Sequence, residues 1–170
     1  MKRIVVLMLC VVLTAACFPV GSLAESQPEE PYLGEIVSET IEYLEDGTQI
    51  VTTVYDNTPT QNDGIATAAT TLTKSGSKVT RGIDSDGEVL WTLTVNGTFT
   101  VVTGSSATCT AASYSYTTPG SGWSLKTGSA TKSANKAIAN GTFVKKLLGI
   151  TLKTQEASVT LTCSVNGTLS

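Results

Sequence analysis

The clearest pattern in the chain is an alternation of apolar and polar residues along residues 91–102 (WTLTVNGTFTVV), in which Trp91, Leu93 and Phe99 all have odd numbers. A period of two predicts a β-strand with one buried and one exposed face. Residues 161–170 (LTCSVNGTLS) repeat the pattern, and alignment on the Asn-Gly pairs places Leu161 on Trp91 and Cys163 on Leu93.

The Asn96-Gly97 pair predicts a tight turn inside the first copy. A two-residue turn would pair Leu93 with Thr100 and mix apolar and polar side chains on one face. A three-residue loop at residues 95–97 pairs Leu93 with Phe99 and leaves glycine where φ must be positive. Because a shift of one residue would expose the whole apolar set, we predict the three-residue loop. The repeated Val-Asn-Gly-Thr is then a structural device and not a binding motif.

Short segments rich in threonine and valine recur after residue 71, separated by Gly, Ser, Asn and Asp. No helical stripe is present after the first 24 residues. Strands are predicted at residues 72–79, 88–94, 98–103, 107–117, 123–131, 135–145, 147–154 and 157–165. This spacing is typical of an antiparallel β-sandwich or barrel, so the fold class is predicted to be all-β.

The N-terminus has the features of an export signal. Lys2 and Arg3 precede an apolar run at residues 4–16, which is too short to span a bilayer but long enough for a signal-peptide core. Cleavage after Ala24 is predicted. Alternatively, Cys17 ends a stretch that resembles a lipoprotein box and would carry a lipid anchor. In both cases the chain is exported, and no later segment is apolar enough to hold it in a membrane.

Charge divides the rest of the chain. Residues 25–63 hold ten Asp or Glu and no Lys or Arg, whereas residues 64–170 hold four acidic and nine basic residues. We predict an acidic arm at residues 25–56, a flexible linker at 57–71 and a sandwich domain at 72–170.

The arm itself reads as a β-hairpin turning at Asp46-Gly47, which would pair Tyr43 with Ile50 and Ile41 with Thr52. Its role has two interpretations: a strand pair docked on the domain or a disordered leader, or a propeptide that covers the basic surface.

Two of the four cysteines, Cys109 and Cys163, lie outside the leader. An even pair in an exported chain predicts a disulfide between them. The chain contains no histidine, which argues against a zinc site or a catalytic thiol at these positions. The absence of histidine also excludes the usual Ser-His and Cys-His catalytic pairs.

The order Cys109, Trp123, Cys163 resembles the Cys…Trp…Cys pattern of immunoglobulin domains, in which a disulfide joins two sheets and packs on a buried tryptophan. Leu161 stands where such domains carry their corner tyrosine. The resemblance implies an immunoglobulin-like β-sandwich as an architecture and not as an ancestry.

Several short stretches are similar to small exported proteins of Gram-positive gut bacteria of the Firmicutes type. They are Asp86-Gly87, residues 91–93 (WTL), 97–101 (GTFTV), 106–109 (SATC) and 161–170. The WTLxxxGTFT pattern also resembles hairpins of repeat-bearing bacterial surface proteins. These resemblances imply a secreted or cell-envelope location, and they supply no catalytic residues.

Three carboxylates, Asp84, Asp86 and Glu88, surround Gly87 and could supply oxygen ligands to Ca²⁺. An EF-hand loop would need a glutamate at its twelfth position, where this chain has Val95. A polar turn leading into the next strand is the favoured interpretation.

Tyr114 and Tyr116 have the parity opposite to Cys109 and are predicted to face solvent as a candidate ligand surface. Residues 145–153 (KKLLGITLK) could contact anionic polymer or lipid, but their alternation favours a half-buried strand packed on the core.

We therefore expect a non-enzymatic envelope or secreted interaction module, with a protein or glycan as ligand and no cofactor. One alternative is a small hydrolase using carboxylates among Asp84, Asp86, Glu88 and Glu156. Another is a structural subunit that exchanges strands, with the acidic arm as donor. Nucleic-acid binding is not expected, because the positive charge is modest and no recognition motif is present.

Overall fold

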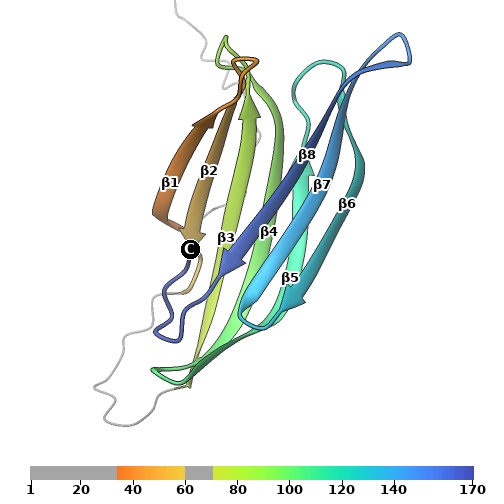
Figure 1. The fold of residues 1–170 in the computed structure, drawn as a ribbon. Coiled ribbons are helices and arrows are strands. Elements are labelled where there is room, and N and C mark those ends of the chain that lie inside the picture. The colour runs from red at the N-terminus through yellow and green to blue at the C-terminus, as the bar shows by residue number, and fades with distance from the viewer. Residues whose placement is uncertain (1–33, 60–70) are drawn as a thin grey trace, which may run out of the picture. The chain divides into compact units, whose positions relative to one another are not determined.

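A computed structural model of the protein describes residues 34–59 and 71–170. The predicted signal peptide, the cleavage site at Ala24, the alternative anchor at Cys17 and most of the predicted linker lie outside these ranges. The described residues form eight strands in two antiparallel sheets (Figure 1). The strands are β1 (Glu35–Tyr43), β2 (Gln49–Asp56), β3 (Thr71–Ile83), β4 (Val89–Val102), β5 (Ser106–Thr117), β6 (Trp123–Ser133), β7 (Lys136–Leu147) and β8 (Ile150–Thr162).

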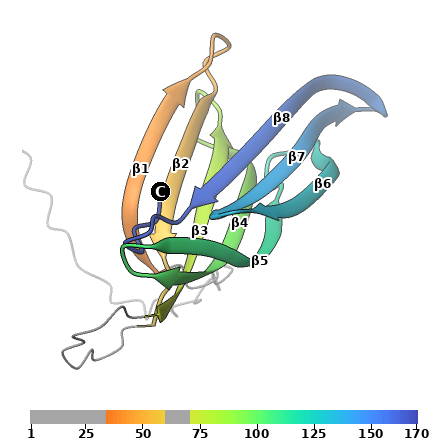
Figure 2. The same cartoon turned by 60° about the horizontal axis from the view of Figure 1, so that its bottom comes forward.

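Sheet A has the order β1-β2-β3-β4-β5 and sheet B has the order β6-β7-β8. The sheets face each other through contacts of β3 and β4 with β8 and of β4 and β5 with β7 (Figures 1 and 2). The predicted all-β class and two antiparallel sheets are confirmed. Within each sheet, every strand pairs only with the strands next to it in the sequence. An immunoglobulin domain, in contrast, also pairs strands that are distant in the chain.

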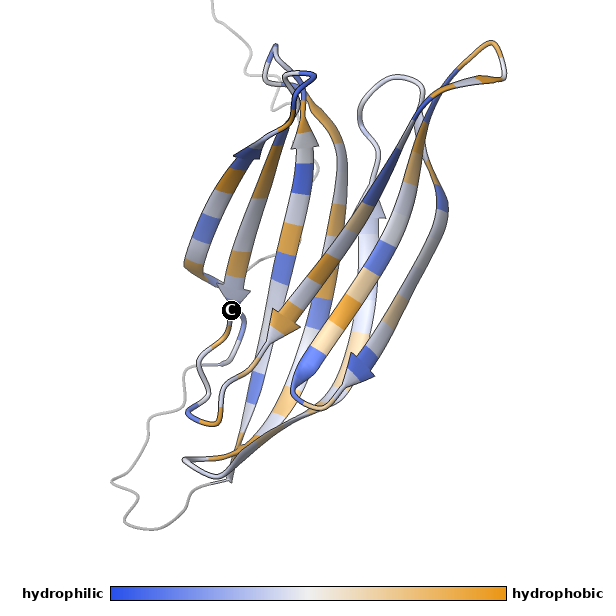
Figure 3. Ribbon diagram, in the orientation of Figure 1, coloured by the Kyte–Doolittle hydropathy of each residue, from blue (hydrophilic) through white to orange (hydrophobic). Residues whose placement is uncertain are grey.

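The core lies between the sheets and is centred on β4. Trp91, Leu93 and Phe99 are each 1% exposed or less, as the alternation predicts. Trp91 stacks on Phe143 of β7 with ring centroids 4.6 Å apart. Figure 3 shows the alternation of hydrophobic and hydrophilic residues along the strands of both sheets. The two layers are therefore held together largely by side chains of their central strands.

The predicted turn at residues 95–97 is wrong, because β4 runs through them without interruption. The φ of Gly97 is not positive, and the glycine lies in phase with the buried residues of the strand. A Cβ at Gly97 would lie 2.8 Å from the ring of Phe99 and 3.0 Å from the Cβ of Ala137 in β7. Glycine is needed here for close packing between the sheets and not for a turn.

The three-residue loop predicted for the first copy is found in the second. Gly167 has a φ of 81°, and its N–H donates to the carbonyl of Ser164 at 2.9 Å. The amide of Ser164 donates to Thr168 at 2.8 Å, and Cys163 pairs with Leu169. The same sequence pattern thus forms a strand interior in β4 and a hairpin turn at the C-terminus.

The acidic hairpin is present as β1 and β2, but its predicted register is wrong by one residue. Tyr43 pairs with Gln49 and Ile41 with Val51, because the turn is a three-residue loop closed by a hydrogen bond from Leu44 to Thr48. β2 pairs with β3 along its whole length, so the hairpin is a continuation of sheet A. The structure therefore agrees with the docked strand pair.

The predicted disulfide is wrong, since Cys109 and Cys163 are both free and buried. The thiol of Cys109 donates to the carbonyl of Ala111 at 3.2 Å, and the thiol of Cys163 donates to that of Ser164 at 3.6 Å. Both cysteines pack in the core cluster with Trp123. Each therefore acts as a small apolar side chain whose S–H has a local acceptor.

Burial raises the pKa of both thiols, so less thiolate is available at pH 8 than for a free cysteine. We expect iodoacetamide to alkylate Cys109 and Cys163 at least about tenfold more slowly in the folded protein than in denaturant. Peptide mass mapping would measure this, and prior treatment with dithiothreitol should change nothing. A need for reductant before these two residues react would contradict the structure.

Candidate functional site

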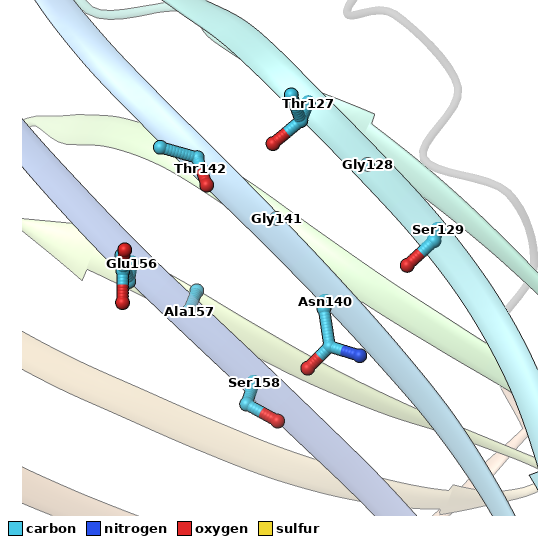
Figure 4. Close-up of a pocket in the computed structure, with 9 residues that line it drawn as sticks. All are labelled: Thr127, Gly128, Ser129, Asn140, Gly141, Thr142, Glu156, Ala157 and Ser158. Carbon is cyan, nitrogen blue, oxygen red and sulfur yellow. The ribbon is translucent and has the colours of Figure 1, made fainter.

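The outer face of sheet B carries a polar groove with a volume of about 430 Å³ (Figure 4). Its floor is the backbone of three small residues that are adjacent across the strands, Gly128, Gly141 and Ala157. Two rows of polar side chains flank this floor. One row is Thr127, Thr142 and Glu156, and the other is Ser129, Asn140 and Ser158.

The groove follows from the alternation in β7. Gly141 is buried in phase with Ala139 and Phe143, so Asn140 and Thr142 point to the opposite face of the sheet. In β6 a bulge between Leu125 and Thr127 sets Thr127 opposite Thr142. Gly128, Gly141 and Ala157 face the core side, so only their backbone lies between the two rows on the outer face.

Gly128 leaves room for a neighbouring side chain on the core side of sheet B. A Cβ at this position would lie 2.6 Å from the ring of Tyr114 in β5. The ring of Tyr114 packs against the core cluster and so reaches the inner side of the groove floor. Glycine at this position is therefore needed for the packing of sheet B on Tyr114.

The six polar side chains of the groove are free to bind a ligand. Within the residues that the structure describes, none of the six donates a hydrogen bond to, or accepts one from, another protein group through its side chain. Hydroxyls both donate and accept, the Asn140 amide does both, and the Glu156 carboxylate accepts. This set suits a ligand that is itself rich in donors and acceptors.

Sheet A carries a smaller groove of about 170 Å³ built in the same way. Its floor is Gly76, Gly97 and Ala112, and the Asn-Gly-Thr of β4 contributes to it as that of β7 contributes to sheet B. Both of its asparagines are used internally: the Asn57 amide donates to Ser77 at 2.6 Å, and Ser77 donates to Asn96 at 2.7 Å. The sheet A groove therefore has both of its asparagines engaged and only Ser75, Thr98 and Ser113 unengaged, whereas all six polar side chains of the sheet B groove are unengaged.

Tyr114 and Tyr116 are not the outward-facing pair that their parity predicts. A bulge at Thr110 sets Cys109 opposite Phe99 and Ala111 opposite Thr98, which reverses the parity of the rest of β5. Tyr114 is therefore opposite Val95 and packs on the core. Tyr116 lies on the same face, 47% exposed near the end of the strand.

Asp84, Asp86 and Glu88 lie in the turn between β3 and β4. One carboxylate oxygen of Asp84 accepts the amides of Asp86 at 3.0 Å and Glu88 at 2.9 Å. This is the hydrogen bonding of a polar turn. In the described ranges, no cluster of three or more His, Cys, Asp or Glu side chains is suited to hold a metal ion.

The carboxylates considered for hydrolysis are not brought into one groove. Glu156 is on the outer face of β8, whereas Asp84, Asp86 and Glu88 are in a turn of sheet A. Glu156 is the single carboxylate among the residues that line the groove of sheet B. A pair of carboxyl groups facing each other across a substrate is therefore not formed in this groove.

Residues 145–153 do not pack on the core as predicted. They form the end of the β7–β8 hairpin, where Leu147, Leu148, Ile150 and Leu152 are all exposed. The alternation of apolar residues does not predict burial here, because the end of the hairpin projects from the rest of the sandwich (Figure 1).

The groove residues other than Glu156 were not identified from the sequence. The available indication was the parity of Asn140-Gly141-Thr142, in which the glycine follows the buried residues Ala137 and Ala139. Locating Thr127, Ser129 and Ser158 requires the strand register, which the sequence does not provide.

Nothing matches the chain in comparisons with protein-family models, with curated proteins or with solved structures. Among the described residues, no helix is long and apolar enough to cross a membrane.

Proposed function

We propose that the protein is an exported, non-enzymatic interaction module that binds a glycan through the groove of sheet B. The observation that carries this proposal is the pair of rows of unengaged hydroxyl, amide and carboxylate side chains over the backbone of Gly128, Gly141 and Ala157. Sugar hydroxyls both donate and accept hydrogen bonds, so they complement such a surface. A single carboxylate in the groove favours binding over hydrolysis.

The proposed location is the cell envelope or the surrounding medium of a Gram-positive bacterium. It is supported by the basic and apolar leader at residues 1–24 and by the resemblance of the strand motifs to small exported proteins. An immunoglobulin-like architecture is supported only as far as two facing antiparallel sheets.

The test uses matched threonines of the two Asn-Gly-Thr sequences. On a glycan array, Thr142→Val in the sheet B groove should weaken binding roughly tenfold, because a hydrogen bond to the ligand is lost. Thr98→Val in the sheet A groove should bind as the unmodified protein does. Valine has nearly the shape of threonine, so both variants should fold.

Two results would contradict the proposal. One is an array on which no glycan is retained, and the other is equal loss of binding in both threonine variants. If a bound glycan were cleaved, and Glu156→Gln abolished the cleavage, a hydrolase would replace the binding module.

A further inference from the structure

The end of the β7–β8 hairpin is an exposed apolar surface, here called the apolar tip and made of Leu147, Leu148, Ile150 and Leu152. These residues are 60%, 94%, 67% and 58% exposed, respectively. Figures 1 and 2 both show the end of this hairpin projecting from the rest of the sandwich. A projecting apolar hairpin end can insert into a partner, whereas it cannot enclose one as a groove does.

The turn at the tip is not explained by folding. Leu148 and Gly149 have φ values of 50° and 82°, so the turn needs two residues in the left-handed region. Asparagine, aspartate and glycine suit such positions, and leucine is strained there. In the β1–β2, β3–β4 and C-terminal turns the positive-φ residue is a glycine alone, and the other non-glycine residue with a positive φ in the described ranges is the much smaller Ala134. An exposed leucine in a strained conformation points to a function outside the fold.

The two strand segments that lead into and out of the tip are basic, and the acidic β1–β2 turn approaches them only at Lys153. Lys145 and Lys146 precede it and Lys153 follows it, and residues 89–155 contain no Asp or Glu. Lys153 is paired with Asp46 of the β1–β2 turn. Lys145 and Lys146 are exposed, and within the described ranges neither side chain has an ion-pair partner. Two cationic side chains therefore stand directly beside the apolar tip.

We propose that the apolar tip inserts into the surface of an anionic lipid bilayer. Leucine and isoleucine side chains would enter the boundary between head groups and acyl chains, while Lys145 and Lys146 stay at the level of the lipid phosphates. Charge favours this partner over an apolar groove of another protein, which would leave the lysines without counter-charge. The proposal goes beyond glycan binding and uses a different part of sheet B.

The test places a fluorescent reporter at the tip of the full chain. Leu148→Trp should show a blue-shifted emission with vesicles that contain phosphatidylglycerol, and brominated acyl chains should quench it. Val165→Trp, in the exposed C-terminal turn, is the matched control and should show neither change. Because the reporter senses its own surroundings, attachment of the chain through the apolar run at residues 4–16 cannot imitate insertion of the tip.

The role of charge is tested in the same background. Lys145→Glu together with Lys146→Glu should reduce quenching at least about fivefold, and salt at 0.5 M should do the same. Equal quenching by purely neutral phosphatidylcholine vesicles would overturn the requirement for anionic lipid. An emission of Leu148→Trp that does not change on any vesicle, or that shifts with protein concentration alone, would overturn insertion itself.

A second variant tests whether Leu148 serves folding. Leu148→Asn gives the turn its preferred residue and should raise the midpoint of thermal unfolding. A lowered midpoint would mean that Leu148 stabilises the fold and is not strained in the turn.

Discussion

Trp91→Ala should lower the free energy of unfolding by about 3–5 kcal/mol, the loss typical of a large aromatic side chain removed from a core. Trp91 is 1% exposed, and it stacks on Phe143 of the opposite sheet. Its removal opens a cavity between the two sheets. Urea denaturation followed by circular dichroism would measure the loss.

Tyr43→Ala is the control, because Tyr43 is an exposed aromatic residue of β1. It should change stability by no more than about 0.5 kcal/mol. A double-mutant cycle of Trp91→Ala with Phe143→Ala should give a coupling of about 0.5–1.5 kcal/mol for the stacked pair. A loss below about 1 kcal/mol for Trp91→Ala would mean that the two sheets do not pack through this residue.

Gly97→Ala should lower stability by about 1–3 kcal/mol through overpacking between the sheets. The new methyl group would meet the Phe99 ring at 2.8 Å and the Ala137 Cβ at 3.0 Å, and both belong to the closely packed core. Thermal and urea unfolding would measure the loss, which the backbone itself does not cause because the φ of Gly97 is not positive.

Gly141→Ala is the matched control for Gly97→Ala, since both glycines lie in an Asn-Gly-Thr sequence at the centre of a sheet. The nearest atom to a Cβ at Gly141 is 3.2 Å away, on the ring of Phe143, so the clash is milder. Its expected cost is therefore smaller than that of Gly97→Ala. Equal costs, or a Gly97→Ala variant as stable as the unmodified protein, would contradict the tight packing at Gly97.

The strands could be predicted from the sequence because one face of each central strand is buried. The alternation along β4 predicts its buried face from Trp91, Leu93 and Phe99, and the burial of all three is confirmed. Parity does not say where a strand ends. An Asn-Gly pair suits a hairpin turn in the C-terminal copy, but at Gly97 the same residues satisfy a packing requirement set by Phe99 and Ala137.

The predicted side-chain directions are wrong where a bulge interrupts the period of two. Thr110 adds one residue to β5, and this addition moves Tyr114 from the predicted solvent face to the core face. Nothing in the local sequence SATCTAASYSYT marks the bulge. The single unpaired residue Thr110 is therefore the reason that Tyr114 and Tyr116 do not form the predicted solvent-facing surface.

The disulfide and the candidate groove depend on which residues become neighbours in space. Cysteine count predicted a bridge, but each thiol instead has an acceptor in its own segment, at Ala111 or Ser164. The groove combines residues from β6, β7 and β8, and only the register of these strands sets Thr127 beside Thr142 and Glu156. Sequence periodicity identifies faces of strands, whereas a site needs pairings between them.

The sequential order of the strands has a consequence for how the chain folds. Apart from the β2–β3 ladder, which closes residues 57–70, each ladder closes a connection of at most five residues. Little chain entropy is therefore lost per pairing, and folding should be faster than for a crossed-over sandwich of similar size. A chain made from its N-terminus completes sheet A first and exposes Trp91, Leu93 and Phe99 until β7 and β8 cover them. That half-built sheet is the species most open to aggregation, and Leu169, which packs on Gly76 of β3, is among the last residues to close it.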